Sequence, residues 1–123
     1  MSNKRTRNSV LTDYLSRSQE IKISVTGRKS GRSFSIPVWF VADDEKLYLL
    51  PVHGSNTQWY KNILKNPAIR IDTSGAKVEL MLAPVIDAKQ VSSVVEKFRV
   101  KYGASDVKKY YSKFDVAVIA QVQ

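Results

Sequence analysis

Apolar and polar residues alternate along several short segments, and this period of two limits the fold more than any other feature of the sequence. The segments at residues 34–40 and 114–122 show it most clearly. Because successive side chains of a strand point to opposite faces of a sheet, each such segment is expected to form a strand with one buried face. The sequence predicts six strands, at residues 21–25, 34–40, 46–50, 68–72, 77–86 and 114–122.

Short turns separate several of the predicted strands, at residues 27–32, 43–45 and 73–75. Strands joined in this way form hairpins, so the sheet is expected to be mostly antiparallel. Pro37 lies inside the second predicted strand. Because proline has no backbone N–H, it is expected at an edge, a bulge or a mouth of the sheet.

Two main helices are predicted from their capping signals. Residues 55–58 have the S-x-x-Q spacing of a capping box, and Pro67 disfavours helix at Asn66, the expected end of the first helix. Asp87 is expected to cap the second helix and Gly103 to end it. Shorter helical stretches are expected at residues 11–15 and 106–111.

These elements suit an α+β fold, namely a small six-stranded, mostly antiparallel β-barrel with two main helices. The 123 residues have the size of one domain. The domain is expected at residues 10–123, after a loose or partly ordered basic arm at residues 1–9. Residues 4–7 of this arm are interpreted as a solubilising tail, with a nucleic-acid or membrane contact as the alternative.

The net charge of +9 favours an anionic partner, which is nucleic acid, an acidic membrane surface or a polyanionic small molecule. A nucleic-acid-binding barrel needs exposed aromatic residues among its cations, whereas Phe34, Phe40 and Phe98 are expected to face inward, so nucleic acid is the less favoured partner.

The chain has no cysteine and one histidine, which excludes a disulfide framework, a thiolate nucleophile and Cys-type or His-rich metal sites. No metal is expected. No apolar run approaches the roughly 20 residues of a membrane span, and the N-terminus lacks the apolar segment of a secretory signal, so a cytoplasmic location is expected.

The turn at residues 27–32, G-R-K-S-G-R, is the first candidate binding site. Its glycines let the backbone approach a ligand closely. Arg28, Lys29 and Arg32 supply positive charge, while the Ser30 hydroxyl and nearby backbone N–H groups can bind phosphate or carboxylate oxygens. The alternative is an ordinary solvated basic turn.

Residues 51–55 are the second candidate, because a predicted strand runs through them directly into a helix N-terminus. Free N–H groups and the positive end of the helix dipole favour an anion at such a place. The alternative is an ordinary capped loop, in which His53 is a loop histidine. Trp59 and Tyr60 are adjacent and point to different helix faces, so one is expected in the core and the other over a ligand or a partner chain.

Tyr102, Tyr110 and Tyr111 are the third candidate. Tyrosines beside the mouth of a barrel can hydrogen-bond a carbonyl substrate or donate a proton. The alternative is that these amphipathic side chains lie at the boundary of the core.

Taken in order, these motifs resemble the deazaflavin-dependent nitroreductase family. Its members are small split β-barrel proteins related to flavin-binding reductases of the pyridoxamine-phosphate-oxidase type. The resemblance covers residues 21–123, and its most specific part is the T-G-R-K-S-G turn together with W-Y-x-N and the following N-P. The matching residues are Thr26, Gly27, Arg28, Lys29, Ser30, Gly31, Pro37, Val38, Phe40, Gly54, Ser55, Trp59, Tyr60, Asn62, Ile63, Asn66 and Pro67.

The resemblance implies that the basic turn holds the phosphate and the oligoglutamyl tail of coenzyme F420, a deazaflavin. It also implies that Pro37 and Val38 line the deazaflavin ring and that residues 51–55 wrap the ring edge or the phosphate side. The cofactor-binding residues implied in this way are Arg28, Lys29, Ser30, Gly31, Arg32, Pro37, Val38, Pro51, Val52, His53, Gly54, Ser55, Trp59 and Tyr60. The implied substrate-contacting residues are Tyr102, Tyr110 and Tyr111.

The implied chemistry is hydride transfer from reduced F420 to a quinone, an activated alkene or a nitro compound. Because the cofactor performs the redox step, no catalytic residue is assigned.

The chain departs from the nitroreductase branch at two points, since His53 replaces a cation and no proline precedes Trp59. FMN, with its single phosphate, therefore remains an alternative cofactor, either for a reductase or for a non-catalytic carrier. A homodimer is expected, although this branch contains monomers as well.

Overall fold

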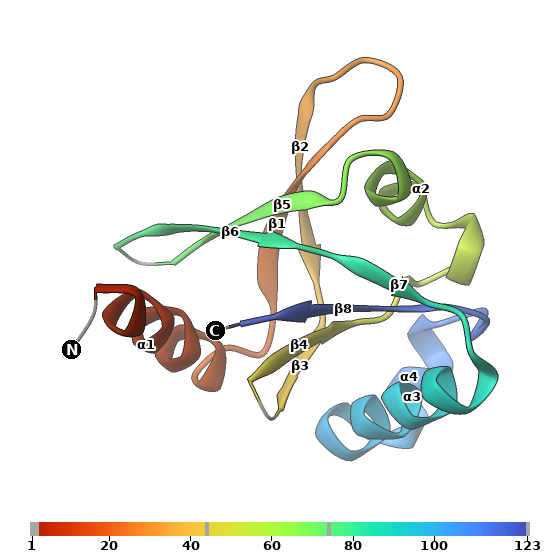
Figure 1. Cartoon of the computed structure of the whole chain (residues 1–123). Helices are drawn as coiled ribbons and strands as arrows, with labels where there is room; N and C mark the ends of the chain where they lie inside the picture. Colours follow the sequence, from red (N-terminus) through yellow and green to blue (C-terminus); the bar gives the residue numbers. More distant parts are fainter. Residues whose placement is uncertain (1–2, 44, 74, 123) are drawn as a thin grey trace.

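The computed structural model describes residues 3–43, 45–73 and 75–122, with side chains from residue 10 onward. Eight strands in this part of the chain form two four-stranded antiparallel sheets (Figure 1). The first sheet consists of β1 (Ile21–Thr26), β2 (Ser33–Val38), β5 (Ala68–Asp72) and β6 (Lys77–Met81), in the order β2-β1-β5-β6. The second consists of β3 (Phe40–Asp43), β4 (Lys46–Leu49), β7 (Ala83–Val85) and β8 (Ala117–Gln121), in the order β3-β4-β8-β7.

Two of the six predicted strands are each divided by a bend, so the predicted strand number is wrong. The segment 34–40 becomes β2 and β3 with Trp39 between them, and the segment 77–86 becomes β6 and β7 with Leu82 between them. Val38 pairs with β1 of the first sheet, whereas Phe40 pairs with β4 of the second. The bent segments therefore connect the two sheets. The sequence does not reveal such a bend, because the apolar alternation of Ile36, Val38 and Phe40 continues through it.

Both main helices and both shorter helical stretches of the sequence prediction are present, and they are α1 (Asn3–Ser16), α2 (Gln58–Lys65), α3 (Ala88–Tyr102) and α4 (Ala104–Tyr110). The caps predicted for α3 are confirmed, because the Asp87 carboxylate accepts the Gln90 N–H at 3.1 Å and Gly103 follows the helix with φ +95°. The capping box at residues 55–58 is wrong. Ser55 lies in a short 3-10 helix, η1 (Gly54–Asn56), and its hydroxyl donates to Asp115, while Thr57 is the residue at the N-cap of α2.

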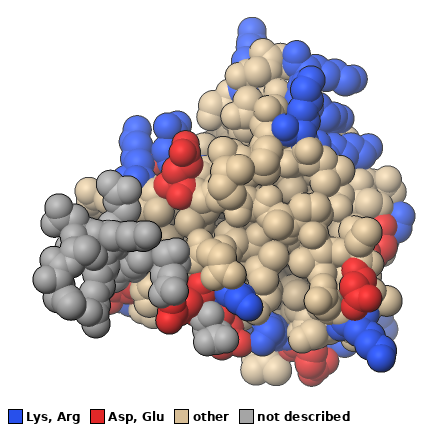
Figure 2. Space-filling view, in the orientation of Figure 1, with Lys and Arg blue, Asp and Glu red and all other residues tan. Residues whose placement is uncertain are grey.

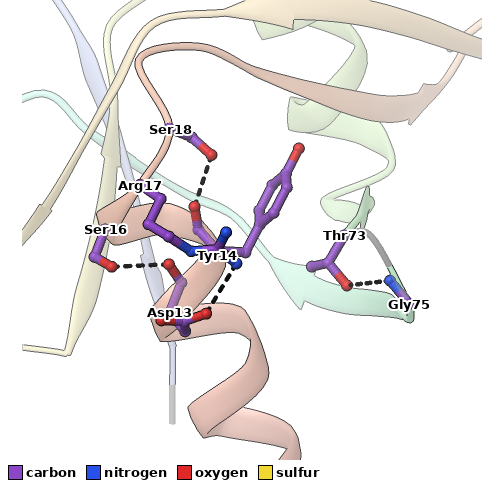
Figure 3. A network of polar contacts seen from close by, with 7 residues as sticks. All are labelled: Asp13, Tyr14, Ser16, Arg17, Ser18, Thr73 and Gly75. Atoms are coloured by element: carbon purple, nitrogen blue, oxygen red, sulfur yellow. Dashed lines mark hydrogen bonds and ion pairs between the residues drawn. The ribbon is translucent and has the colours of Figure 1, made fainter.

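Helix α1 packs at one side of the sheets (Figure 1), and its Leu11 and Leu15 are buried in the core between them. The helix begins at Asn3, so it runs through the boundary that the sequence places between residues 9 and 10. Figure 3 shows its last turn, where the Ser16 hydroxyl donates to the Asp13 carbonyl at 2.8 Å and Arg17 pairs with the Asp13 carboxylate. The side chains of residues 4–7 lie outside the described residues, so the role of the basic arm stays a prediction.

Hydrophobic side chains form two cores, one between the sheets and one between the second sheet and helices α3 and α4. Phe40 and Phe98 are fully buried, as the sequence predicts. Phe34 is 45% exposed, which corrects the expectation that it faces inward. The cause is its position on β2, an edge strand whose hairpin with β1 projects beyond the sheet (Figure 1). The same edge position confirms the prediction for Pro37.

The predicted turns at residues 43–45 and 73–75 connect β3 to β4 and β5 to β6. Asp44 and Ser74 lie outside the described residues. Among the helices that the structure describes, none is long and apolar enough to cross a lipid bilayer.

Candidate functional site

Two cavities lie side by side on the molecule and share Ile36 and Trp59 in their walls. The first, called the aromatic cavity below, has a volume of about 420 Å³ and lies between β2, the loop after β4 and the end of α4. The second, called the basic cavity, has a volume of about 520 Å³ and lies between the β1–β2 turn and α2. The aromatic cavity is lined by Glu20, Ile36, Pro37, Val38, Trp39, Leu50, Val52, Thr57, Trp59, Tyr110 and Tyr111. The basic cavity is lined by Gly27, Arg28, Lys29, Ser30, Phe34, Ser35, Ile36, Gln58, Trp59 and Asn62.

The β1–β2 turn has a shape fixed by its own hydrogen bonds. Gly27 donates to the Arg32 carbonyl at 2.7 Å, and the Arg32 N–H donates to the Ser30 hydroxyl oxygen at 3.1 Å. Gly31 has a φ of +73°, a left-handed conformation that favours glycine. A Cβ on Gly27 would lie 2.7 Å from the Phe34 ring, so only glycine lets this ring pack against the turn. Both glycines therefore serve the turn's geometry.

Helix α2 holds the turn through Arg28. The Asn62 side-chain oxygen accepts both the Arg28 backbone N–H at 3.1 Å and the Arg28 Nη1 at 2.7 Å. The Gln58 side-chain oxygen accepts Arg28 Nη2 at 2.9 Å, and Lys65 Nζ donates to the Arg28 carbonyl at 3.2 Å. Asn62 is buried, which makes this a fixed contact between two elements that are far apart in the sequence.

Positive charge at the turn is not neutralised within the described part of the chain, where no carboxylate forms an ion pair with Arg28, Lys29 or Arg32. Figure 2 shows Lys and Arg side chains gathered over the projecting β1–β2 hairpin. A concave site with uncompensated charge of one sign attracts ligands of the opposite sign. The basic cavity is therefore suited to phosphate or carboxylate groups.

Trp39 forms the floor of the aromatic cavity at the corner where the chain passes from β2 to β3. Its ring stacks on Tyr102 with centroids 4.1 Å apart and an interplanar angle of 9°. Tyr110 meets the same ring edge-on at 5.5 Å. The rings of Trp39, Tyr110 and Tyr111, together with apolar side chains of β2, make a surface on which a flat ring system can pack.

Tyr102 does not line either cavity and supports Trp39 from behind. Its hydroxyl oxygen accepts the Phe40 N–H at 3.0 Å, and its single hydrogen can be donated either to the Gln19 carbonyl at 2.7 Å or to the Phe40 carbonyl at 2.9 Å. Lys101 donates to the same Phe40 carbonyl at 2.8 Å. Burial raises the pKa of Tyr102 and lowers the pKa of Lys101 to about 8. The last turn of α3 therefore clamps the corner that carries Trp39.

Tyr110 and Tyr111 both line the aromatic cavity but differ in burial. Tyr110 is 51% exposed, whereas Tyr111 is buried between Phe98 and Phe114. Burial raises the pKa of Tyr111 well above its ordinary value. Its hydroxyl therefore stays protonated at neutral pH and can donate a hydrogen bond to a ligand in the cavity.

The loop at residues 51–55 is held to the segment that follows α4, and only Val52 of this loop lines a cavity. His53 Nδ1 lies 2.7 Å from the Ser112 hydroxyl, and the Ser55 hydroxyl donates to the Asp115 carboxylate at 2.5 Å. Burial works to raise the pKa of Asp115, but the hydrogen bonds from Ser55 and the nearby Lys113 charge together hold it below its ordinary value.

The structure brings together about half of the residues predicted for the site. Those that line a cavity are Arg28, Lys29, Ser30, Pro37, Val38, Val52, Trp59, Tyr110 and Tyr111. Those that line neither are Gly31, Arg32, Pro51, His53, Gly54, Ser55, Tyr60 and Tyr102. Of the adjacent pair Trp59 and Tyr60, both are buried, with Trp59 at the shared wall and Tyr60 in the core. The assignment of these residues to a cofactor or substrate stays a prediction.

Several residues that line the cavities were not assigned to the site by sequence reasoning, and three of them, Trp39, Gln58 and Asn62, make the contacts described above. Asn62 lies within the W-Y-x-N motif, and its spacing from Gln58 puts both side chains on the face of α2 that meets the turn. Trp39 carries no such signal, because an alternating strand pattern assigns it to the outer face. Among the described residues, no group of three or more His, Asp or Glu side chains is placed to hold a metal ion.

Solved structures with this fold include proteins of different functions. An F420-H2 dependent reductase (FDR-A) is 15% identical with a TM-score of 0.64, covering 84% of this chain and 94% of that chain. An F420 reductase is 21% identical with a TM-score of 0.62, and the match covers 89% of this chain and 90% of the reductase chain. HutZ, a heme storage protein from Vibrio cholerae, is 15% identical with a TM-score of 0.68, and the match covers 90% of this chain and 86% of the HutZ chain. At these identities the likeness shows the fold alone, and it supports the predicted split-barrel type.

Sequence comparison gives the family. A search of curated proteins finds no match. A family model described as "Uncharacterized protein conserved in bacteria (DUF2255)" matches residues 12–119, which is most of the chain. The chain therefore belongs to the DUF2255 family.

Proposed function

We propose that this protein is an oxidoreductase that uses reduced coenzyme F420 to transfer a hydride to a quinone, an activated alkene or a nitro compound. The observation that carries the proposal is the continuity of the two cavities through Ile36 and Trp59. One cavity is apolar and aromatic, and the other carries uncompensated positive charge. A ligand with a flat ring at one end and several negative charges at the other matches both.

The residues present fit this cofactor. Pro37, Val38 and Trp39 offer an apolar surface for the ring, while Arg28 and Lys29 offer cations for the phosphate and the glutamyl carboxylates. When bound, the cofactor supplies the hydride. The protein's part is to bind and orient the reactants and to keep water away from the ring.

The electron acceptor would enter the aromatic cavity from the side of Tyr110, which is half exposed. Tyr111 stays protonated in its buried position, so its hydroxyl is suited to hydrogen-bond a carbonyl or nitro oxygen of the acceptor. This role for Tyr110 and Tyr111 keeps the sequence prediction, whereas Tyr102 acts on the acceptor only through Trp39.

Haem, suggested by the heme storage protein HutZ among the structural neighbours, is less well supported. Histidine holds the haem iron in globins and peroxidases, and this chain has only His53. That ring is paired with Ser112 and lines neither cavity. FMN remains the main alternative, because Arg28 could hold its single phosphate and the aromatic cavity could hold its ring.

The test is a fluorescence titration of the purified protein with F420 and, in parallel, with FMN. Lys29→Ala and Arg28→Ala remove cations of the basic cavity, and Arg99→Ala removes an exposed cation on α3 as the matched control. We expect selective F420 binding that weakens by roughly tenfold in each cavity variant and is unchanged in the control. A preference for FMN would move the protein to flavin chemistry.

Turnover separates an enzyme from a carrier. Oxidation of reduced F420 is followed after addition of a quinone, an activated alkene or a nitro-aromatic. We expect at least one class to be reduced. If F420 binds but no class is reduced, the protein is a carrier, and if neither cofactor binds, nucleic acid returns as the anionic partner to test.

A further inference from the structure

Arg28 is held in an unusual way for a cation, because both of its side-chain contacts are neutral amides. Asn62 and Gln58 stand four residues apart on α2, and their side-chain oxygens accept Arg28 Nη1 at 2.7 Å and Nη2 at 2.9 Å. Asn62 also accepts the Arg28 backbone N–H at 3.1 Å, so one buried side chain fixes both the backbone and the guanidinium. Among the residues that the structure describes, no carboxylate forms an ion pair with this guanidinium.

The electrostatic consequence follows from the chemistry of the partners. A carboxylate at either position would hold the guanidinium at least as strongly but would offset its charge. An amide oxygen holds it and leaves the charge intact. A guanidinium has five N–H donors, and these contacts use one on each Nη atom. No hydrogen bond among the described residues occupies the remaining donors, and Arg28 lines the basic cavity.

We propose that Asn62 and Gln58 are positioning residues that present Arg28 as a pre-oriented, uncompensated cation for an anionic oxygen group, phosphate or carboxylate, of the ligand in the basic cavity. Pre-orientation reduces the side-chain entropy lost on binding, so the neutral amides contribute to affinity without touching the ligand. The inference rests on the proposed function in taking this cavity as the ligand site. It goes further by naming which residues tune the charge there.

Replacement of each amide by its acid tests this directly. Asn62→Asp and Gln58→Glu keep the shape of the side chain and its hydrogen bonds to Arg28 but place a negative charge against the guanidinium. A purely structural tether would be preserved or strengthened by this change. Asn56→Asp adds the same charge in η1, at an exposed position that lines neither cavity, and is the matched control.

The measurement is the dissociation constant for four probes at two salt concentrations, with a thermal melt of every variant. The probes are F420, FMN, inorganic tripolyphosphate and a γ-linked glutamate peptide. We expect both acid variants to melt no lower than wild type and to bind F420 roughly tenfold more weakly, with a smaller salt dependence. Weaker binding of tripolyphosphate alone assigns Arg28 to phosphate, and weaker binding of the peptide alone assigns it to the glutamyl tail.

The outcomes separate this inference from the function on which it rests. If wild type binds tripolyphosphate or the peptide but not F420, and the acid variants lose that binding, the proposed cofactor is wrong and the role of the amides stands. If wild type binds F420 and both acid variants bind it as tightly as wild type does, the amides are only structural and the inference is overturned. If Asn56→Asp weakens ligand binding as much as the two acid variants do, the inference is also overturned, because the weaker binding would then follow from the change in net charge alone.

Discussion

Removing the hydroxyl of Tyr102 tests whether this residue supports the cavity wall or contacts the substrate. In Tyr102→Phe the ring remains and can still stack on Trp39 at the 4.1 Å centroid distance. The hydroxyl that accepts the Phe40 N–H at 3.0 Å is lost, and Phe40 is fully buried. The variant therefore separates the clamp from the stack.

The expected cost follows from the contacts that remain. The Phe40 carbonyl keeps its bond from Lys101 Nζ at 2.8 Å, and Gln19 is exposed, so its carbonyl can bond to water. The Phe40 N–H is left without a partner, which costs about 1–3 kcal/mol. We expect the free energy of unfolding to fall by about 2 kcal/mol. With a urea m-value of about 2 kcal/mol/M, the unfolding midpoint should fall by about 1 M.

Urea unfolding followed by tryptophan fluorescence measures this change, and Tyr110→Phe is the matched control. Tyr110 is half exposed at the cavity wall, so its variant should lie within about 0.5 kcal/mol of wild type. We expect Tyr102→Phe to be less stable but, once folded, to retain most of its turnover. Unchanged stability together with lost turnover would refute the clamp and restore Tyr102 as a substrate contact.

Three further predictions concern the loop at residues 51–55 and the α3 clamp. Gly54→Ala should lower the free energy of unfolding by about 2 kcal/mol or more in a thermal melt. Gly54 has a φ of +55°, and a Cβ added there would collide with the Asp115 carboxylate. Gly75→Ala is the control and should change the stability little, because a Cβ added at Gly75 meets open space. Asp115 has a lowered pKa, so its stabilising contribution is present above the ordinary pKa of 3.8 and is lost as pH falls through the pKa of the folded state. The free energy of unfolding in urea should therefore depend less on pH in Asp115→Asn than in wild type under acidic conditions. An equal pH dependence in the two proteins would contradict this. Burial lowers the pKa of Lys101 from 10.5 to about 8, so between these pH values the unfolded chain binds one proton more than the folded protein. The free energy of unfolding of wild type should therefore rise with pH relative to that of Lys101→Arg, whose side chain does not titrate in this range. A pH-independent difference in the free energy of unfolding between the two proteins would show that Lys101 is not desolvated.

Local chemistry in the sequence was enough to predict the four helices and both ends of α3, although two of the predicted strands are each two strands in the structure. Asp87 caps α3 and Gly103 ends it, because each of these residues acts on backbone groups a few positions away. Ser55 has the same kind of signal but does not cap α2. Its hydroxyl finds Asp115, sixty positions along the chain, and no local pattern contains that competitor.

The basic turn was also predictable, because glycines and cations at residues 27–32 identify both its shape and its charge. Its attachment to α2 was not predicted as a contact, although Asn62 belongs to a quoted motif. The 2.7 Å bond from Arg28 Nη1 to Asn62 joins residues 34 positions apart. Trp39 was missed for a related reason, since its place in the aromatic cavity depends on the stack with Tyr102 of α3.

The sequence by itself determined the alternating strands, the helix ends set by local caps, the excess of positive charge and the turn that carries part of it. Those features depend on backbone conformation and side-chain type within a few residues. The tertiary structure alone decided that two strands bend between sheets, that Phe34 is exposed, and that two cavities meet at Ile36 and Trp59. These features depend on which distant segments pack together, and packing between distant segments is set by the shape of the whole molecule rather than by any local pattern.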